Sequence, residues 1–267
     1  MFEKHRLLKE RLRAYGTLVV AFSGGVDSTF LLASAYEVLG PRVIAVMCRS
    51  PFVPERESRE ALEFCEIRGI RLVTFTFDPF ETETLKDNPP DRCYHCKRAI
   101  FSRIMKIATD NGITVVAEGS NVDDLGDYRP GMRAIEELGV KSPLREAGLT
   151  KQEIRQLSKN MELPTWDKPS YACLASRLAY GEEITEDKLK RIELAEEILI
   201  GLGYKNERVR LHGDLARIEV MPEDIPRLAA EGTREMICER FRALGFLYVT
   251  LDLGGYKMGS MNDTLVQ

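Results

Sequence analysis

The chain has 267 residues, of which 44% are hydrophobic and 30% are charged, a composition typical of soluble globular proteins with one large or two ordinary domains. No apolar run approaches the roughly 18 residues that a membrane span needs. The formal net charge of −4 excludes a whole-chain basic field for sequence-independent nucleic-acid binding. Residues 1–16 are charged where a secretory signal would be apolar, so we expect a cytoplasmic protein that begins with an amphipathic helix, with Leu7, Leu8 and Leu12 facing inward.

The first half of the chain alternates between predicted strands and helices. Residues 17–22 form a continuous apolar, β-branched run, typical of a strand buried on both faces of a parallel sheet. The alternation that follows predicts an α/β fold with a doubly wound, mostly parallel sheet. The predicted helices cover 29–39, 55–68, 92–111 and 150–160, the last opened by a Thr150–Glu153 capping box, and the further strands cover 42–47, 71–77 and 113–117.

The pattern changes after residue 163. Residues 163–180 have neither a helical nor a strand period, so we expect a long ordered loop, a feature that is often functional. A smaller C-terminal α+β domain should follow, with a helix at 186–202, strands at 207–211, 215–220 and 247–251, and one or two helices before residue 244. The expected domains are 1–165, an active-site loop at 166–182, and 183–267.

The segment Ser23–Ser28 reads SGGVDS and lies between the first predicted strand and helix, at the carboxyl end of the strand, where open α/β sheets bind ligands. Paired glycines let the backbone approach an anion, while the helix N-terminus and nearby hydroxyls supply donors. The alternative is an ordinary strand-to-helix turn. We expect a pyrophosphate group to bind through Ser23, Gly24, Gly25, Asp27, Ser28 and Thr29.

The same segment lacks the Walker and dinucleotide spacings and resembles the SGGxDS loop of the ATP pyrophosphatases. That resemblance implies cleavage of ATP between its α and β phosphates and adenylation of a carbonyl or carboxylate oxygen. It also implies that Asp27 holds Mg²⁺ with the phosphates, whereas otherwise Asp27 only caps the helix.

Three cysteines stand in polar or helix-start contexts. Cys93 and Cys96 lie three apart in the first turns of a predicted helix, whose dipole favours thiolate, and Cys173 lies in the predicted loop. Three thiolates are an incomplete set: zinc would need a fourth ligand such as His95, whereas a [4Fe–4S] cluster would leave one iron open to sulfide. A Cys-x-x-Cys without a metal or redox role is the alternative. The other cysteines, Cys48, Cys65 and Cys238, are expected to be buried apolar side chains.

Seven segments along the chain form an ordered series. They are AFSGGVDST (21–29), NPPDRCYHCK (88–97), DLGDYRPGMRA (124–134), SPLREAGLTKQEIR (142–155), KPSYACLASRLAYG (168–181), RVRLHGDLARIE (208–219) and VTLDLGGYKMGSMNDTL (249–265). Through them the chain resembles the LarE family, the ATP-dependent sulfur transferases of nickel-pincer nucleotide biosynthesis, which serves lactate racemase maturation. The resemblance implies adenylation of a carboxylate on pyridinium-3,5-dicarboxylate mononucleotide, sulfur transfer and AMP release, twice per product.

The family obtains its sulfur in two ways. One branch sacrifices a loop cysteine and lacks the Cys-x-x-Cys pair; alignment of the motifs puts that donor at Ala172, one residue before Cys173. Because Cys93, Cys96 and Cys173 are all present, the chain resembles the other branch, in which a [4Fe–4S] cluster holds an extra sulfide that attacks the acyl-adenylate. Sacrificial transfer from Cys173 is the alternative.

The resemblance also implies roles for charged residues. In the DYRPG segment Asp127 and Arg129 are expected to be catalytic, and Tyr128 and Arg133 to contact substrate or nucleotide; a simple turn with an exposed ion pair is the alternative. Arg177 would neutralise phosphate charge or, alternatively, tether its loop.

Further charged residues lie in the C-terminal part of the chain. Arg208 and Arg210 share a strand face and would bind nucleotide, while Glu196 and Glu219 match carboxylates near a metal; solvated charges on an exposed strand edge are the alternative. Lys257 would reach a phosphate or, alternatively, lie on the surface.

The implied cofactors are ATP, Mg²⁺ and a [4Fe–4S] cluster, and the implied partners are a nucleotide-linked pyridinium dicarboxylate, sulfide or another sulfur donor, and further copies of the chain, a hexamer being one candidate. We expect no nucleic-acid or membrane partner. A tRNA thiolation enzyme would instead carry a basic tract or an added RNA module. A cluster or zinc protein that binds ATP only as a regulatory ligand would form no AMP.

Overall fold

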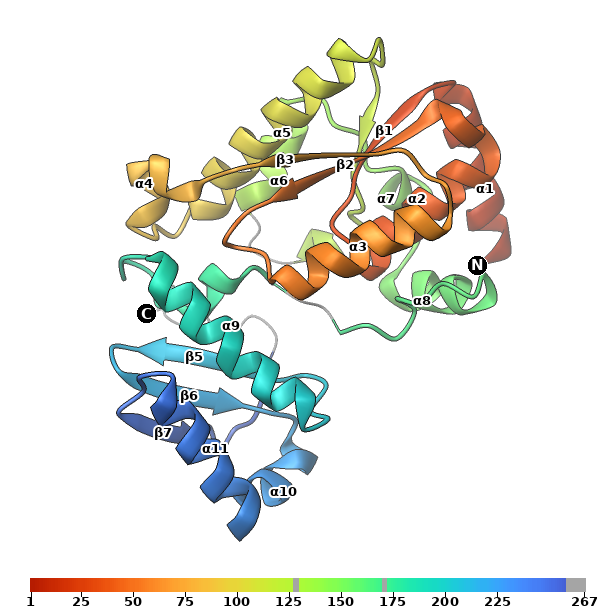
Figure 1. Ribbon diagram of the computed structural model, residues 1–267. Coiled ribbons are helices and arrows are strands. Elements are labelled where there is room, and N and C mark those ends of the chain that lie inside the picture. Colours follow the sequence, from red (N-terminus) through yellow and green to blue (C-terminus); the bar gives the residue numbers. More distant parts are fainter. Residues whose placement is uncertain (127–129, 170–171, 258–267) are drawn as a thin grey trace. The chain divides into compact units, whose positions relative to one another are not determined.

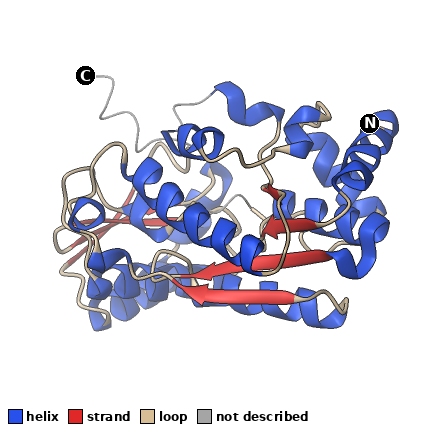
Figure 2. Cartoon of the chain, turned by 90° about the horizontal axis from the view of Figure 1, so that it is seen from above, coloured by secondary structure: helices blue, strands red, loops and turns tan. Residues whose placement is uncertain are grey.

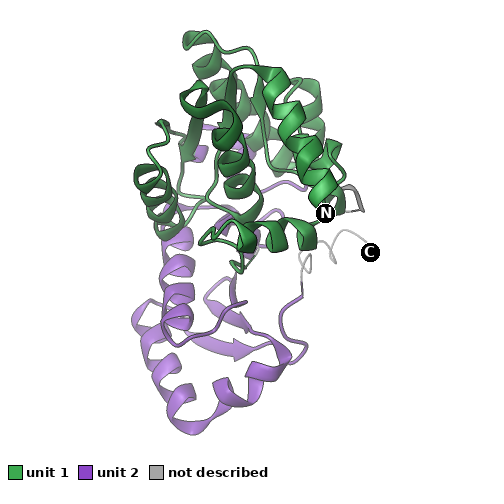
Figure 3. Ribbon diagram, turned by 90° about the vertical axis from the view of Figure 1, so that its right-hand side faces the viewer, with its two compact units in different colours: residues 1–78, 91–171 green, residues 79–90, 172–267 purple. Residues whose placement is uncertain are grey.

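A computed structural model describes residues 1–126, 130–169 and 172–257 of the protein. The chain forms two compact units, residues 1–78 with 91–171 and residues 79–90 with 172–267 (Figure 3). No helix in the described ranges is long and apolar enough to cross a membrane. Asp127, Tyr128 and Arg129 lie outside the described residues.

The first unit contains a four-stranded parallel sheet (Figure 1). Its strands are β1 (Leu18–Ala21), β2 (Val43–Arg49), β3 (Leu72–Thr76) and β4 (Val116–Ala117), in the order β3-β2-β1-β4. Val19 pairs with Ile44 on one side and with Val116 on the other. The predicted α/β fold with a parallel sheet is confirmed, and the order of strands changes direction between β1 and β4.

Helices cover both faces of this sheet (Figure 2). Side chains of the central strands alternate between two apolar clusters, one on each face: Leu18, Val20 and Ala45 belong to one cluster, and Val19 and Ile44 to the other. This explains the continuous apolar runs, because both faces are buried. The first cluster includes residues of α1 (Phe2–Tyr15), α2 (Val26–Leu39), α3 (Glu55–Ile67), α7 (Pro143–Glu146) and α8 (Lys151–Asn160), and the second includes residues of α5 (Arg92–Asp110) and α6 (Pro130–Glu137).

Three details of the first unit differ from expectation. Helix α2 begins at Val26 rather than at residue 29, so its first helical turn includes residues of the SGGVDS motif. Strand β4 is only two residues long. Leu8 and Leu12, four residues apart, are buried, but Leu7 is 38% exposed because it lies on the solvent side of α1.

The second unit contains a three-stranded sheet. Strand β5 (Arg208–His212) is antiparallel to β6 (Leu215–Glu219), which is parallel to β7 (Tyr248–Leu251). The expected C-terminal α+β pattern is confirmed. Its helices are α4 (Glu83–Lys86), α9 (Glu186–Gly201), α10 (Ile225–Ala229) and α11 (Glu231–Ala243). In the described residues of both units, short 3₁₀ helices cover Gly40–Arg42, Pro79–Glu81, Val122–Gly126, Leu174–Arg177 and Pro222–Asp224.

Residues 79–90 group with the second unit, although they fall within the range 1–165 expected for the first domain. The Asn88 side chain is fully buried and its amide donates to the carbonyl oxygen of Ala179 at 2.7 Å. The backbone N–H groups of Gly181 and Ile184 donate to the carbonyls of Asn88 and Lys86. These long-range hydrogen bonds tie the segment to the start of the second unit.

The predicted capping box at the start of α8 is present, and it carries a testable charge effect. Lys4 and the N–H and hydroxyl of Thr150 all donate to the Glu153 carboxylate, and the Lys4 bond contributes most to lowering the Glu153 pKa from its ordinary 4.5 to about 2. A carboxylate whose pKa is lowered in the folded state stabilises the fold at pH values above its ordinary pKa. This stabilisation is lost as the pH falls towards the pKa of the folded state.

We expect Glu153→Gln to lower the free energy of unfolding by about 1–2 kcal/mol at pH 7, allowing for screening at this partly exposed site. Urea unfolding of both proteins should show this difference shrinking below pH 4.5 and vanishing near pH 2. Glu239→Gln, at an exposed position of α11, is the control and should change little at either pH. A difference independent of pH would contradict the assigned charge effect.

Candidate active site

The Ser23–Thr29 loop joins β1 to α2, and Gly25 is the N-cap of that helix. The Ser28 hydroxyl accepts from the Ser23 N–H at 3.3 Å, contacts the Ser23 hydroxyl at 3.0 Å and donates to the Gly25 carbonyl at 3.2 Å. These bonds hold the loop in a tight turn at the N-terminus of a helix, where backbone N–H groups are available to an anion. We call residues 23–29 the phosphate loop.

Gly24 lets the phosphate loop approach α3. Its φ is +71°, in the left-handed region that favours glycine, and an added Cβ would lie 2.9 Å from the Cβ of Ala61. No other residue fits this position without moving α3 or the loop. The first glycine of the SGG motif is therefore required by its left-handed φ and by the close approach of α3.

A second segment, residues 118–121 after β4, packs closely against the phosphate loop and was not predicted from the sequence. A Cβ added to Gly119 would lie 2.9 Å from the backbone nitrogen of Ser28. The buried Glu118 carboxylate accepts from the N–H and hydroxyl of Ser120 and from the Ser142 hydroxyl at 2.5 Å, which fixes the segment. Because β1 and β4 are neighbours where the strand order reverses, the position of this segment is that of a ligand crevice.

Two lysines lie at hydrogen-bond distance from the phosphate loop. Lys151, at the start of α8, donates to one Asp27 oxygen at 2.5 Å, and Asn121 donates to the other at 3.3 Å. Lys168 donates to the Gly24 carbonyl at 3.3 Å and to Glu60 at 2.8 Å. Two ammonium groups thus meet the loop from different segments, and neither was singled out in the sequence, where each is one lysine among many.

A pocket of about 570 Å³ opens beside the phosphate loop within the first unit. It is lined by Phe22, Gly24, Thr29, Phe64 and Lys168, among others. The Thr29 side chain is fully buried, and within the described part of the chain its hydroxyl has no hydrogen-bond partner. A buried hydroxyl of this kind is an available donor or acceptor for a ligand at the loop.

Lys151 provides a direct test of anion binding at the loop. A charge-assisted hydrogen bond to phosphate contributes about 1.5–3 kcal/mol, so we expect Lys151→Met to weaken ATP binding at least about tenfold. Equilibrium binding of a fluorescent ATP analogue measures this without any second substrate. Lys106→Met, which removes an exposed lysine paired with Asp110 on α5, is the control. Unchanged ATP affinity in the Lys151 variant would contradict a phosphate role.

The Cys-x-x-Cys pair lies in the first turns of α5, as expected, with both side chains partly exposed. Gly131 of α6 packs against this turn so closely that an added Cβ would lie 3.2 Å from the Cys93 carbonyl. His95, considered as a zinc ligand, contacts Asp91 at 3.1 Å. The described residues contain no cluster of three or more His, Cys, Asp or Glu side chains arranged to hold a metal ion.

Two further site candidates, Arg133 and Lys257, are exposed. Arg133 stacks on the Tyr94 ring and pairs with Glu137.

Of the three cysteines expected to be buried, Cys65 is buried, and burial raises its pKa to about 12. Cys48 and Cys238 are only partly buried, so that expectation is wrong for them.

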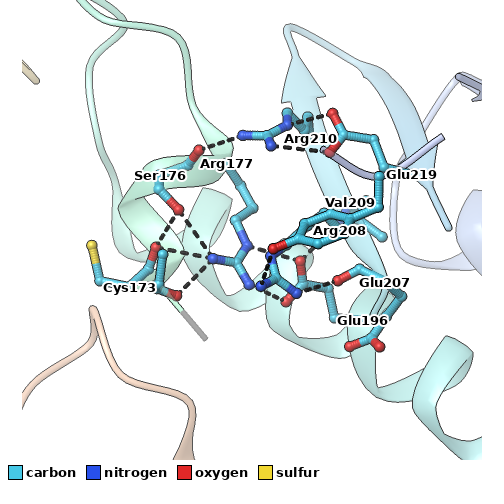
Figure 4. Close-up of polar contacts among 11 residues, drawn as sticks. Cys173, Ser176, Arg177, Glu196, Glu207, Arg208, Val209, Arg210 and Glu219 are labelled. Atoms are coloured by element: carbon cyan, nitrogen blue, oxygen red, sulfur yellow. Dashed lines mark hydrogen bonds and ion pairs between the residues drawn. The ribbon is translucent and has the colours of Figure 1, made fainter. Parts of the chain in front are cut away.

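The second unit brings five predicted site residues together in one buried network (Figure 4). Arg177 is bidentate to Glu196 at 2.8 and 2.9 Å, and Arg210 is bidentate to Glu219 at 2.6 and 3.0 Å. Arg208 donates to the Glu207 carbonyl at 2.5 Å and stacks on the Tyr256 ring. Arg177, Glu196, Arg208, Arg210 and Glu219 are each at most 8% exposed, so solvated charges on an exposed edge are excluded for them.

Charge pairing in this network follows from burial. Burial alone lowers the pKa of Arg177, but the charge and hydrogen bonds of Glu196 outweigh it, so the pKa is raised. Burial and then the Arg177 charge lower the pKa of Arg208. Both oxygens of Glu196 and of Glu219 accept from a guanidinium. The roles expected for these residues toward nucleotide and metal stay predictions, and what the structure shows is mutual pairing.

A parallel α/β sheet with an SGGxDS loop at the reversal of strand order defines the class of PP-loop ATP pyrophosphatases. No profile of a known protein family matches the chain. The chain is 41% identical over 249 residues to an uncharacterised protein of Synechocystis, covering 93% of each chain. It is 37% identical over 265 residues to the pyridinium-3,5-bisthiocarboxylic acid mononucleotide synthase of Lactiplantibacillus plantarum, covering 99% of this chain and 95% of that one.

The chain therefore belongs to the family of that synthase, the LarE family. A more distant relative is a tRNA-specific 2-thiouridylase of Carboxydothermus hydrogenoformans, 29% identical over 57% of this chain and 53% of that one. The family was identified correctly from the seven sequence segments.

Proposed function

We propose that the protein is an ATP-dependent sulfur transferase that converts carboxylates of pyridinium-3,5-dicarboxylate mononucleotide to thiocarboxylates, for nickel-pincer cofactor synthesis. The observation that carries this proposal is the 37% identity to the Lactiplantibacillus synthase over 99% of the chain. The phosphate loop supports the ATP-dependent half of the reaction. The thiouridylase match covers only about half of that protein and lends tRNA thiolation less support.

In the first half-reaction a substrate carboxylate oxygen would attack the α-phosphorus of ATP. The new bond joins that oxygen to phosphorus, the bond to the β-phosphate oxygen breaks, and pyrophosphate leaves with the electron pair. The backbone N–H groups of the phosphate loop and the hydroxyls of Ser23 and Ser28 would bind the leaving pyrophosphate. Lys151 and Lys168 would neutralise its charge.

Asp27 fits a role in holding Mg²⁺. Its carboxylate is partly exposed at the start of α2, within the phosphate loop, and its oxygens face the amide of Asn121 and the ammonium of Lys151. Carboxylate oxygen is the ligand that Mg²⁺ prefers, and the ion is commonly shared with substrate phosphates. When bound, Mg²⁺ would neutralise phosphate charge, and Lys151 would then be available to the phosphates.

In the second half-reaction a sulfide would attack the acyl carbon of the adenylate. A carbon–sulfur bond forms, the carbon–oxygen bond to AMP breaks, and AMP leaves with the electron pair, while the proton of hydrosulfide passes to solvent. The product is a thiocarboxylate. The co-reactant that balances the step is therefore inorganic sulfide or a donor equivalent to it.

Cys93, Cys96 and Cys173 would hold a [4Fe–4S] cluster in this proposal. The donor chemistry fits: two partly exposed thiols lie one turn apart at the N-terminus of α5, where the helix dipole favours thiolate. The proposal requires Cys173 of the second unit as the third ligand. When bound, such a cluster would supply an open iron able to carry sulfide.

The test is reconstitution with iron and sulfide under anaerobic conditions, followed by ATP, Mg²⁺ and the dicarboxylate mononucleotide. We expect AMP, pyrophosphate and a mass gain corresponding to replacement of oxygen by sulfur, over many turnovers per chain. A single thiocarboxylate per chain with loss of sulfur from Cys173 would assign the sacrificial route instead. Absence of AMP with this substrate would refute the proposed function.

A further inference from the structure

Arg177 is among the largest fully buried side chains of the protein, with 1% of its surface exposed. Its Nε and Nη2 donate to the two oxygens of Glu196. Its Nη1 donates to the carbonyls of Ala172 and Cys173, at 2.7 and 3.2 Å, and to the Ser176 hydroxyl at 3.0 Å. All three guanidinium nitrogens are thus engaged within the second unit.

Glu196 anchors this arrangement to the rest of the second unit. It lies on α9 and is 4% exposed, and its Oε1 also accepts from the backbone N–H of Val209 in β5 at 3.0 Å. Arg210, held by Glu219, donates to the Ser176 carbonyl at 2.9 Å. The guanidinium groups of Arg177 and Arg210 therefore bind backbone carbonyls within residues 172–177. Glu196 of α9 and Glu219 of β6 hold these two guanidinium groups in place.

The residue at the centre of these contacts is Cys173. Its carbonyl oxygen accepts from the Ser176 N–H at 2.9 Å, the Ser176 hydroxyl at 2.8 Å and Arg177 Nη1. Its sulfur points away from the Arg177 guanidinium, whereas its carbonyl points toward it (Figure 4). The network thus holds the backbone of Cys173 and directs the thiol outward from the buried charges.

We propose that the Arg177–Glu196 pair is a positioning device for Cys173: it fixes the backbone that presents the thiol, and it does not contact nucleotide. The inference rests on the proposed function only in taking Cys173 as a group used in sulfur transfer. Arg177 and Glu196 are then positioning residues. Since misplacing a reacting group by about 1 Å can cost about 100-fold in rate, loosening residues 172–177 should impair sulfur transfer selectively.

The test compares three variants. Arg177→Lys keeps the charge but cannot make the bidentate pair or all the carbonyl bonds. The double variant R177M/E196M replaces the whole pair with apolar side chains, which avoids an uncompensated buried charge. Glu193→Gln is the matched control, since Glu193 lies one turn earlier on α9 and pairs with the more exposed Lys190.

Three measurements are made on each protein. Iodoacetamide alkylation of Cys173, in protein without cluster or nucleotide, is followed by peptide mass spectrometry with Cys93 as internal reference. AMP formation and thiocarboxylate formation are measured separately after reconstitution. We expect Cys173 alkylation to rise at least about threefold and sulfur transfer to fall about tenfold or more in the double variant, with AMP formation and the KM for ATP within about twofold.

A tenfold rise in the KM for ATP would overturn the proposal and assign Arg177 to the nucleotide. Unchanged alkylation and unchanged sulfur transfer would also overturn it. Should the double variant fail to fold, as shown by equal rises in alkylation at Cys173 and Cys93, Arg177→Lys decides by the same criteria. If the wild type forms no AMP, the proposed function fails, but the alkylation comparison still decides the positioning role.

Discussion

Gly119→Ala is expected to lower ATP-dependent AMP formation by about 100-fold or more. The added Cβ would lie 2.9 Å from the Ser28 nitrogen, closer than real Cβ contacts come, and 3.2 Å from the Asp27 carbonyl carbon, which is tighter than most. The atoms it meets are backbone, so either the phosphate loop or the segment after β4 must move. The Ser28 N–H is one of the groups that an anion would use, and donors of this kind contribute about 10²–10³ in rate.

Initial rates of AMP release and equilibrium ATP binding both measure this effect. Gly232→Ala in α11 is the control: a Cβ there would meet nothing within 4 Å, and alanine is the better helix former, so activity should be unchanged and stability equal or slightly higher. Melting temperature separates local from global damage. Wild-type AMP formation by Gly119→Ala would show that the segment after β4 is not part of the nucleotide site.

Cys93→Ala should abolish sulfur incorporation while leaving AMP formation within about twofold of the wild type. The side chain sits in the first turn of α5, and the phosphate loop with its two lysines is built from β1, the start of α2, residues 118–121, Lys151 and Lys168. Loss of one thiol ligand removes cluster binding but none of the groups assigned to pyrophosphate.

Iron and acid-labile sulfide content, AMP release and product mass are measured on the same preparation. Cys238→Ala on α11 is the control, because it removes a partly exposed thiol that has no assigned role. Sulfur transfer by iron-free Cys93→Ala protein would refute the cluster proposal. Loss of ATP use alone would instead assign the Cys-x-x-Cys pair to the nucleotide half-reaction.

Much of the fold was predictable because its signals are local. The apolar run at residues 17–22 is continuous since β1 is buried on both faces, and the Thr150–Glu153 spacing forms the capping box of α8. The phosphate loop was found from a contiguous motif, and its glycine at φ +71° explains one motif position.

The missing parts of the loop are contributed by distant segments. Gly119, Asn121, Lys151 and Lys168 carry no local pattern that distinguishes them from ordinary loop and helix-start residues. They meet the loop through β4 pairing with β1, α8 packing on α2, and the return of residues 162–169. A closer reading could have used one signal: a Gly two residues after the strand predicted at 113–117.

For the charged residues of the second unit, the sequence did not predict burial or pairing. Their types and their alternation along β5 were visible in the sequence, and they indicated a charged surface or a ligand site. Folding buries them, and a buried charge must be paired, so Arg177 takes Glu196 and Arg210 takes Glu219. Which carboxylate neutralises which guanidinium depends on the packing of α9 against β5 and of β5 against β6.

From the sequence by itself came the parallel α/β unit, the phosphate loop, the cysteine pair at a helix start and the family. All of these depend on residue types at short, regular spacings, and such local patterns can be recognised without knowing any long-range contact. Only the tertiary structure decided that residues 79–90 belong with the second unit, that Gly119 closes on Ser28 and that Arg177 holds the backbone of Cys173. Those outcomes depend on steric fit and on charge neutralisation between residues far apart in the chain, which no local pattern encodes.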